Sequence, residues 1–63
     1  MKNRNLILGN QLMRSGKLED AVAAYEIAIA SHPSFPWSHY QLGQALEKLG
    51  RWEDALVAYQ KAI

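Results

Sequence analysis

Cysteine is absent from this sequence of 63 residues, which excludes disulfide bonds and thiolate-bound metals. Long apolar runs are lacking too: behind a basic start, Leu6-Ile7-Leu8 is followed at once by Gly9 and polar residues, which is too short for the core of a signal peptide. No stretch approaches the roughly 18 apolar residues that a membrane span needs. The absence of cysteine also fits a reducing compartment, and a cytoplasmic location is the default expectation.

Neither sign of charge predominates in the chain. Seven basic and six acidic side chains give a formal net charge of +1, and they are scattered along the sequence. A surface for nucleic acid or for an anionic membrane is therefore not expected. Apolar residues are abundant at 49%, which argues against disorder. Only one small domain fits this length, and such domains often need oligomerisation or a longer array for stability.

The strongest signal is an internal repeat. Shifting the chain against itself by 34 residues aligns residues 2–29 with 36–63, and eleven of the 28 pairs are identical. A period in this range is typical of stacked-repeat architectures. We therefore divide the chain into a first unit at residues 2–35 and a second, shorter unit at 36–63. The identical pairs are Leu8/Leu42, Gly9/Gly43, Leu12/Leu46, Gly16/Gly50, Glu19/Glu53, Asp20/Asp54, Ala21/Ala55, Ala24/Ala58, Tyr25/Tyr59, Ala28/Ala62 and Ile29/Ile63.

Each unit is predicted to form two helices joined by a turn, which makes the protein all-α with about four helices. The first helices are expected at roughly 3–14 and 36–48. Gly16 and Gly50 stand where these helices should end, because glycine adopts the left-handed C′ conformation without steric cost. The second helices carry apolar stripes at Leu18, Ala21, Val22, Tyr25, Ala28 and Ile29 and at Trp52, Ala55, Leu56, Tyr59, Ala62 and Ile63.

The charges near the two turns match the helix dipoles. Arg14 and Lys48 fall near the carbonyl ends of the first helices, while acidic pairs, Glu19-Asp20 and Glu53-Asp54, open the second helices. Between the units, the segment 32–36 contains Pro33 and Pro36 and cannot continue a helix. Ser34 is expected to cap the following helix, with Pro36 in its first turn.

Two further glycines, Gly9 and Gly43, fall in the middle of the first helices. A mid-helix glycine costs roughly 0.5–1 kcal/mol relative to alanine, so something must press close at each position. Small residues recur along the second helices at Ala21/Ala55 and Ala28/Ala62. We therefore expect close backbone approach within each hairpin and between neighbouring hairpins.

These residues and their spacing resemble the tetratricopeptide repeat family, whose 34-residue unit favours particular residues at positions 4, 7, 8, 11, 20, 24, 27 and 32. The first unit supplies Leu8, Gly9, Ala21, Tyr25, Ala28 and Pro33, and the second supplies Leu42, Gly43, Ala55, Tyr59 and Ala62. The resemblance covers essentially the whole chain and implies tandem antiparallel helical hairpins, as in an α-solenoid. The chain departs from the pattern at Asn5, His39, Leu12 and Leu46. Trp37 and Trp52 are expected to supply some of the missing bulk.

The resemblance also implies a peptide-binding groove and thus a protein-interaction scaffold. The corresponding stripes comprise Asn3, Leu6, Asn10 and Met13 on the first helix and Trp37, Tyr40, Gln44 and Glu47 on the third. Asn10 and Gln44 are suited to hydrogen-bond an extended peptide backbone. Trp37 and Tyr40 either contact a ligand, as aromatic residues at interfaces often do, or pack against Phe35 and the preceding hairpin. A clamp for a terminal carboxylate is not expected, because Leu6 stands where the first lysine of such clamps belongs.

Catalytic and metal-binding patterns are missing from the sequence. His32 and His39 are the only histidines, and no carboxylate lies in register with them. No glycine-rich phosphate loop or metal-ligand spacing occurs either. We expect no enzyme activity, no cofactor and no metal.

Self-association is the other expectation, because arrays of the resembled family usually end in an extra helix that covers the last apolar stripe. The stripe of Trp52, Leu56, Tyr59 and Ile63 has no such helix after it in this sequence. Exposed apolar patches of that kind usually mark interfaces. The stripe is expected to pair with another chain, giving a homo-oligomer, or to meet the neighbouring repeats of a longer chain. A further alternative is an N-terminal accessory segment of a larger enzyme such as a transferase.

Overall fold

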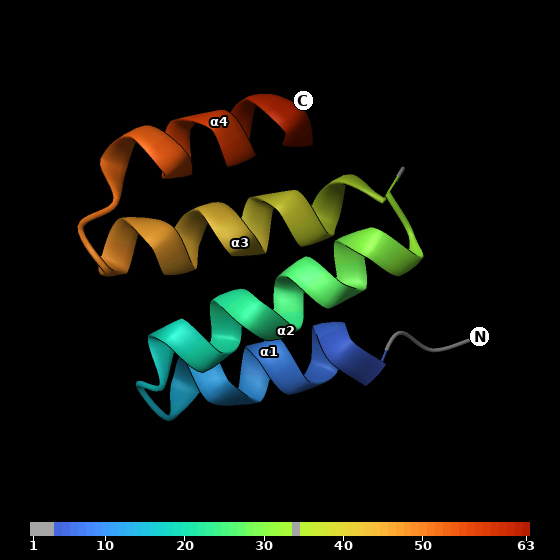
Figure 1. Ribbon diagram of the computed structural model, residues 1–63, viewed down its shortest axis with the longest axis vertical. Helices are drawn as coiled ribbons and strands as arrows, with labels where there is room; N and C mark the ends of the chain where they lie inside the picture. The colour runs from blue at the N-terminus through green and yellow to red at the C-terminus, as the bar shows by residue number, and fades with distance from the viewer. Residues whose placement is uncertain (1–3, 34) are drawn as a thin grey trace.

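A computed structural model describes residues 4–33 and 35–63, and these form four α-helices without a strand. The helices are α1 (Arg4–Arg14), α2 (Leu18–Ser31), α3 (Pro36–Lys48) and α4 (Trp52–Ala62). They lie against one another in chain order, α1 on α2, α2 on α3 and α3 on α4, and α1 also touches α3 (Figure 1). The predicted all-α fold of two antiparallel hairpins is confirmed. The described helices include none that is long and apolar enough to cross a membrane.

Both hairpin turns are made by glycine in the left-handed region. Gly16 and Gly50 each have φ of +79°. The amide of Lys17 donates to the carbonyl of Leu12 at 2.9 Å, and the amide of Arg51 donates to the carbonyl of Leu46 at 2.9 Å. These bonds satisfy carbonyl groups that the ends of α1 and α3 would otherwise leave unpaired. The two glycines therefore end their helices as predicted.

Charged residues lie at the helix ends that suit them. Glu19 and Asp20 are in the first turn of α2, and Glu53 and Asp54 are in the first turn of α4. Basic residues occupy the last turns of α1 and α3, as the sequence predicted. Neither α2 nor α4 has a side-chain cap, and the Arg51–Asp54 ion pair at 2.9 Å is exposed. Such a pair stabilises the fold by at most about 1 kcal/mol.

The corner between the hairpins follows from proline. α2 ends at Ser31, and α3 begins at Pro36, where the missing N–H costs no helical hydrogen bond. Phe35 immediately precedes α3, and its amide donates to the carbonyl of His32 at 3.2 Å. The predicted cap, Ser34, lies outside the described residues.

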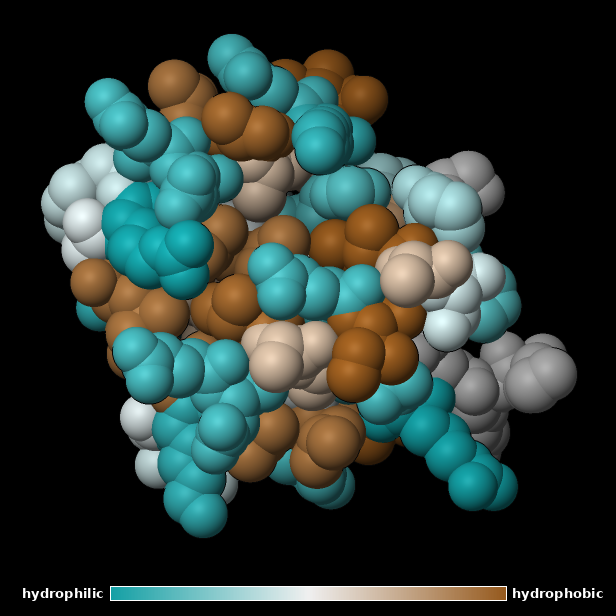
Figure 2. All heavy atoms as spheres, viewed as in Figure 1, coloured by the Kyte–Doolittle hydropathy of each residue, from teal (hydrophilic) through white to brown (hydrophobic). Residues whose placement is uncertain are grey.

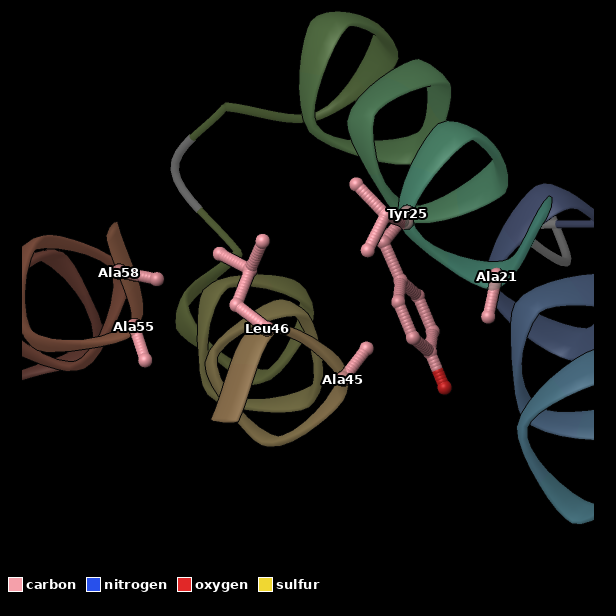
Figure 3. Packing of buried hydrophobic residues seen from close by; sticks show 7 residues of the cluster. Ala21, Tyr25, Ala45, Leu46, Ala55 and Ala58 are labelled. Atoms are coloured by element: carbon pink, nitrogen blue, oxygen red, sulfur yellow. The ribbon is translucent and has the colours of Figure 1, made fainter. Parts of the chain in front are cut away.

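The core is built largely from alanine. Tyr25 is the largest fully buried side chain, and it reaches between α2 and α3 with Ala45 pointing towards its ring (Figure 3). On the other side of α3, Ala55 and Ala58 of α4 face Leu46 (Figure 3). Small side chains let the helices approach closely and leave little apolar area to bury in so short a chain. The buried cluster comprises Ala21, Val22, Tyr25, Ala45, Leu46, Ala55 and Ala58.

Gly9 and Gly43 are closely contacted, as predicted, but the prediction of close backbone approach as the cause was wrong. A Cβ atom at Gly9 would lie 2.5 Å from Cε1 of Tyr25, and one at Gly43 would lie 2.7 Å from Cε1 of Tyr59. Each glycine thus receives a tyrosine ring from the second helix of its own hairpin. The small residues of the second helices do not explain the two glycines, because the ring of a larger side chain crosses the hairpin to reach them.

Candidate functional site

The predicted groove residues fall on neighbouring helices, since α1 touches α3. On α1, Leu6 and Met13 are half-buried and pack against the core, and Asn10 is half-buried too. On α3, Gln44 is half-buried, whereas Trp37, Tyr40 and Glu47 are exposed. Asn3 lies outside the described residues. The binding role of these residues stays a prediction, and the exposed residues among the described members of the set lie on α3.

The polar members of this set that the structure describes, Asn10, Gln44 and Glu47, form hydrogen bonds with tyrosine hydroxyl groups. Tyr25 donates to Oδ1 of Asn10 at 2.7 Å, and Tyr59 donates to Oε1 of Glu47 at 2.7 Å. Nε2 of Gln44 donates to the hydroxyl of Tyr40 at 3.2 Å. Tyr25 donates to the carbonyl oxygen of Asn10, so this bond leaves the two N–H donors of the Asn10 amide group unused. These contacts restrict the orientations of the side chains that they join.

Both of these donor tyrosines are held in the neutral form. Burial raises the pKa of Tyr25, and the positive charge of Arg14 opposes that effect in part. For Tyr59, burial and then the hydrogen bond and negative charge of Glu47 raise the pKa to about 12, with Tyr40 adding to the effect. The two phenols therefore remain hydrogen-bond donors at neutral pH.

Aromatic rings form a continuous row from α3 to α4. The ring centroids of Trp37 and Tyr40 are 5.2 Å apart at an interplanar angle of 31°, and those of Tyr40 and Tyr59 are 5.8 Å apart at 51°. The separations are typical of favourable offset aromatic pairs. Trp37 nevertheless stays 52% exposed, so the row presents its first ring to solvent. Trp37 does not fill the core gap that the sequence assigned to it, and neither does Trp52, which is 65% exposed.

An apolar hollow of about 700 Å³ lies beside the aromatic row, where the start of α3 meets the end of α4. Its volume is in the range of ligand-binding pockets, which are mostly apolar. Sequence reasoning found Trp37 and Tyr40 as groove residues but missed the contribution of Phe35 and Pro36. The adjacency of Phe35-Pro36-Trp37 in sequence was the signal that pointed to an aromatic cluster here. The hollow is lined by Phe35, Pro36, Trp37, Tyr40, Tyr59, Ala62 and Ile63.

The apolar stripe predicted for self-association is mostly exposed. Trp52 and Leu56 on α4 are 65% and 58% exposed, and Ile63 is fully exposed. Tyr59 differs from these three, since its ring lies against the Gly43 position and beside Tyr40. Elsewhere, apolar side chains reach the surface across the middle of the face drawn in Figure 2, over α2 and α3, among polar ones.

Comparison with models of protein families identifies the family of the chain. A family model described as TPR repeat matches residues 9–50, two-thirds of the sequence. The chain belongs to the tetratricopeptide repeat (TPR) family. A second model, described as Tetratricopeptide repeat, matches residues 38–63. TPR repeats generally mediate protein–protein interaction and are typically non-catalytic. No curated protein matches this TPR chain.

The described residues hold no group of three or more His, Asp or Glu side chains that could bind a metal ion. His32 is exposed in the corner, and His39 is half-buried on α3. Among the buried side-chain polar atoms of the described part of the chain, the hydroxyl oxygen of Ser38, which is completely buried, lacks a hydrogen-bond partner. Ser38 lies in the first turn of α3.

Proposed function

We propose that this chain is a protein-interaction module that binds a peptide or protein segment along α3, with Trp37 and Tyr40 as its main contacts. The observation that carries the proposal is the exposed aromatic row beside an apolar hollow of about 700 Å³. An apolar side chain of the bound segment enters this hollow. Gln44 and Asn10 hydrogen-bond the backbone of the segment, and the charge of Glu47 disfavours acidic residues nearby.

The size of the surface limits the affinity of the chain as it stands. α3 has 13 residues and α1 has 11, so the two helices are about 20 Å and 16 Å long. Two such helices set about 8–10 Å apart present a few hundred Å², whereas a stable interface takes about 800 Å² per partner. We expect dissociation constants in the micromolar range or weaker.

The two tryptophans provide a matched pair for a test. Peptides selected from a displayed random library on the wild-type chain are titrated by calorimetry against the variants Trp37→Ala and Trp52→Ala. Loss of an aromatic contact at the centre of an interface commonly weakens binding by at least about tenfold, and this is expected for Trp37→Ala. Trp52→Ala should bind within about twofold of the wild type, since Trp52 does not line the hollow. An equal loss in both variants would reject the α3 surface.

A second candidate function is self-association through the stripe of Trp52, Leu56, Tyr59 and Ile63. It is favoured by a comparison within the molecule, because Val22 occupies in α2 the place that Leu56 occupies in α4. Val22 is 7% exposed beneath α3, whereas Leu56 is 58% exposed. The same face would receive a following helix in a longer chain. Burial of such a face is favourable by roughly 25 cal/mol per Å².

Sedimentation equilibrium tests the second candidate with another matched pair. Leu56→Glu places a charge in the stripe and is expected to keep the chain monomeric. Val57→Glu, at a residue of α4 that is also exposed but outside the stripe, should associate like the wild type. A wild-type chain that stays folded and monomeric at high micromolar concentration would refute self-association.

A further inference from the structure

The repeat allows the α2–α3 contact to serve as a template for other contacts of the chain. When the sequence is shifted by 34 residues, α1 aligns with α3 and α2 aligns with α4. The contact of α3 with α2 therefore indicates which side chains a helix needs at the contact in order to stack on α4. If α1 of another copy met this requirement, copies would stack head to tail without limit, since such a contact uses two different surfaces.

The template requires small side chains at two positions of α3. Ser38 and Ala45 are both 0% exposed. Ala45 points towards the ring of Tyr25 in α2 (Figure 3). Because Ser38 is completely buried, its position tolerates little additional volume. Its hydroxyl has no hydrogen-bond partner among the described residues, so the surroundings offer no polar group to a longer side chain.

The corresponding positions of α1 hold Arg4 and Gln11. Both are exposed, as their side chains require. At the place of Ser38, Arg4 would have to bury a permanent charge, and at the place of Ala45, Gln11 would have to fit a longer polar side chain into a closed contact. Ile7 and Leu8, also exposed on α1, would by themselves suit a stacking contact.

Charge adds to the mismatch. In the template the start of α3 lies at the end of α2, because a short corner joins them. Arg4, at the start of α1, would therefore meet the end of α4, which carries Lys61. The acidic residues of α4, Glu53 and Asp54, are in its first turn at the other end. A stacked copy would bring like charges together and leave Arg4 without an acidic partner.

We infer that Arg4 and Gln11 make the outer face of α1 a barrier to head-to-tail stacking of copies of this chain. Where copies associate through α4, as the second candidate function proposes, the barrier restricts them to a closed pair in which each contributes α4. A contact between two like surfaces closes on itself and cannot extend. This last step rests on the proposed self-association, whereas the barrier itself follows from Arg4 and Gln11 on α1 and from the charge at the end of α4.

The test replaces the two barrier residues by those that α3 uses. Arg4→Ser/Gln11→Ala is compared with the wild type by sedimentation equilibrium over a series of concentrations. The average mass of the wild type should not exceed twice that of the monomer, whereas that of the double variant should keep rising with concentration. Adding Leu56→Glu to the double variant should abolish the growth, since the stacked contact needs the α4 stripe.

Arg14→Ser is the charge-matched control, and it should behave like the wild type because Arg14 is exposed at the end of α1. Helical circular dichroism should be unchanged in all variants, since the substituted positions of α1 and α4 are exposed. A double variant with the mass of the wild type, or a wild type that grows beyond a pair, would overturn the inference. A monomeric wild type beside a growing double variant would reject the proposed self-association and support the barrier.

Discussion

Tyr25 and Tyr59 occupy the same place in the two hairpins but lie in different surroundings. Each ring covers a glycine on the first helix of its hairpin, and each hydroxyl donates a hydrogen bond to a side chain of that helix. Tyr25 is completely buried beneath α3, whereas Tyr59 is only half-buried and borders the apolar hollow. The same residue therefore makes a fixed core contact in the first hairpin and one wall of a candidate binding surface in the second.

This difference predicts unequal effects of adding a methyl group at the two glycines. Gly9→Ala brings Cβ to 2.5 Å from a buried ring that cannot move aside. Overpacking costs about 1–3 kcal/mol, which exceeds the gain of up to about 1 kcal/mol in helix propensity. Gly43→Ala should be closer to neutral, since Tyr59 has room to turn towards solvent. Urea unfolding followed by circular dichroism measures both, and a Gly9→Ala variant that is more stable than the wild type would contradict this packing.

Tyr59 also predicts how stability depends on alkaline pH. Its pKa is raised from 10.0 to about 12 in the folded chain. Between these values the folded state keeps the phenolic proton while the unfolded state releases it, so the free energy of unfolding falls as pH rises from 10.0 towards about 12. Tyr59→Phe should show a smaller fall, with other groups titrating equally in both proteins. Thermal melts across this pH range provide the measurement, and parallel curves for the two proteins would argue against the Tyr59 contribution.

At the scale of the helices and turns, sequence reasoning succeeded where the signal was local. The left-handed turns at Gly16 and Gly50 and the ends of α1 and α3 follow from residues within a few positions of each boundary. The mid-helix positions of Gly9 and Gly43 indicated a close contact, but they did not indicate which side chain makes it. The rings that contact them come from the opposite helix of the hairpin, and sequence spacing alone did not specify which side chain crosses.

The two classes of glycine should respond differently to substitution. A Cβ at Gly50 would meet nothing within 4 Å, so only the backbone conformation at φ of +79° opposes a side chain there. Gly50→Ala should destabilise by about 1–2 kcal/mol, and Gly50→Asn by less, because asparagine tolerates this region. At Gly9 the order reverses, since asparagine is larger than alanine. Denaturant unfolding of the alanine and asparagine variants of both glycines distinguishes backbone strain at Gly50 from crowding at Gly9. If alanine and asparagine ranked in the same order of stability at both positions, backbone strain would not explain the difference between Gly50 and Gly9.

At the scale of the whole molecule, the fold was predictable and the candidate site only in part. The repeat fixed four helices and placed Trp37 and Tyr40 on one stripe of α3. The hollow also needs Ala62 and Ile63, which pairing of α3 with α4 brings to the start of α3. Likewise, the hydrogen bonds of Asn10 and Glu47 to tyrosines depend on how the hairpins close. A periodic pattern gives the face of each helix, but contacts between helices depend on side-chain length and rotamer.

The central claim is that this TPR chain acts by binding a protein segment at the aromatic row of α3. An NMR titration of the labelled chain with a library-selected peptide tests it most directly, because each amide and each indole N–H reports its own surroundings. The account predicts saturable shifts that are largest at the indole of Trp37 and at the amides of Tyr40 and Gln44, with the indole of Trp52 little changed. Shifts centred on Trp52 and Leu56, with Trp37 unaffected, would contradict it.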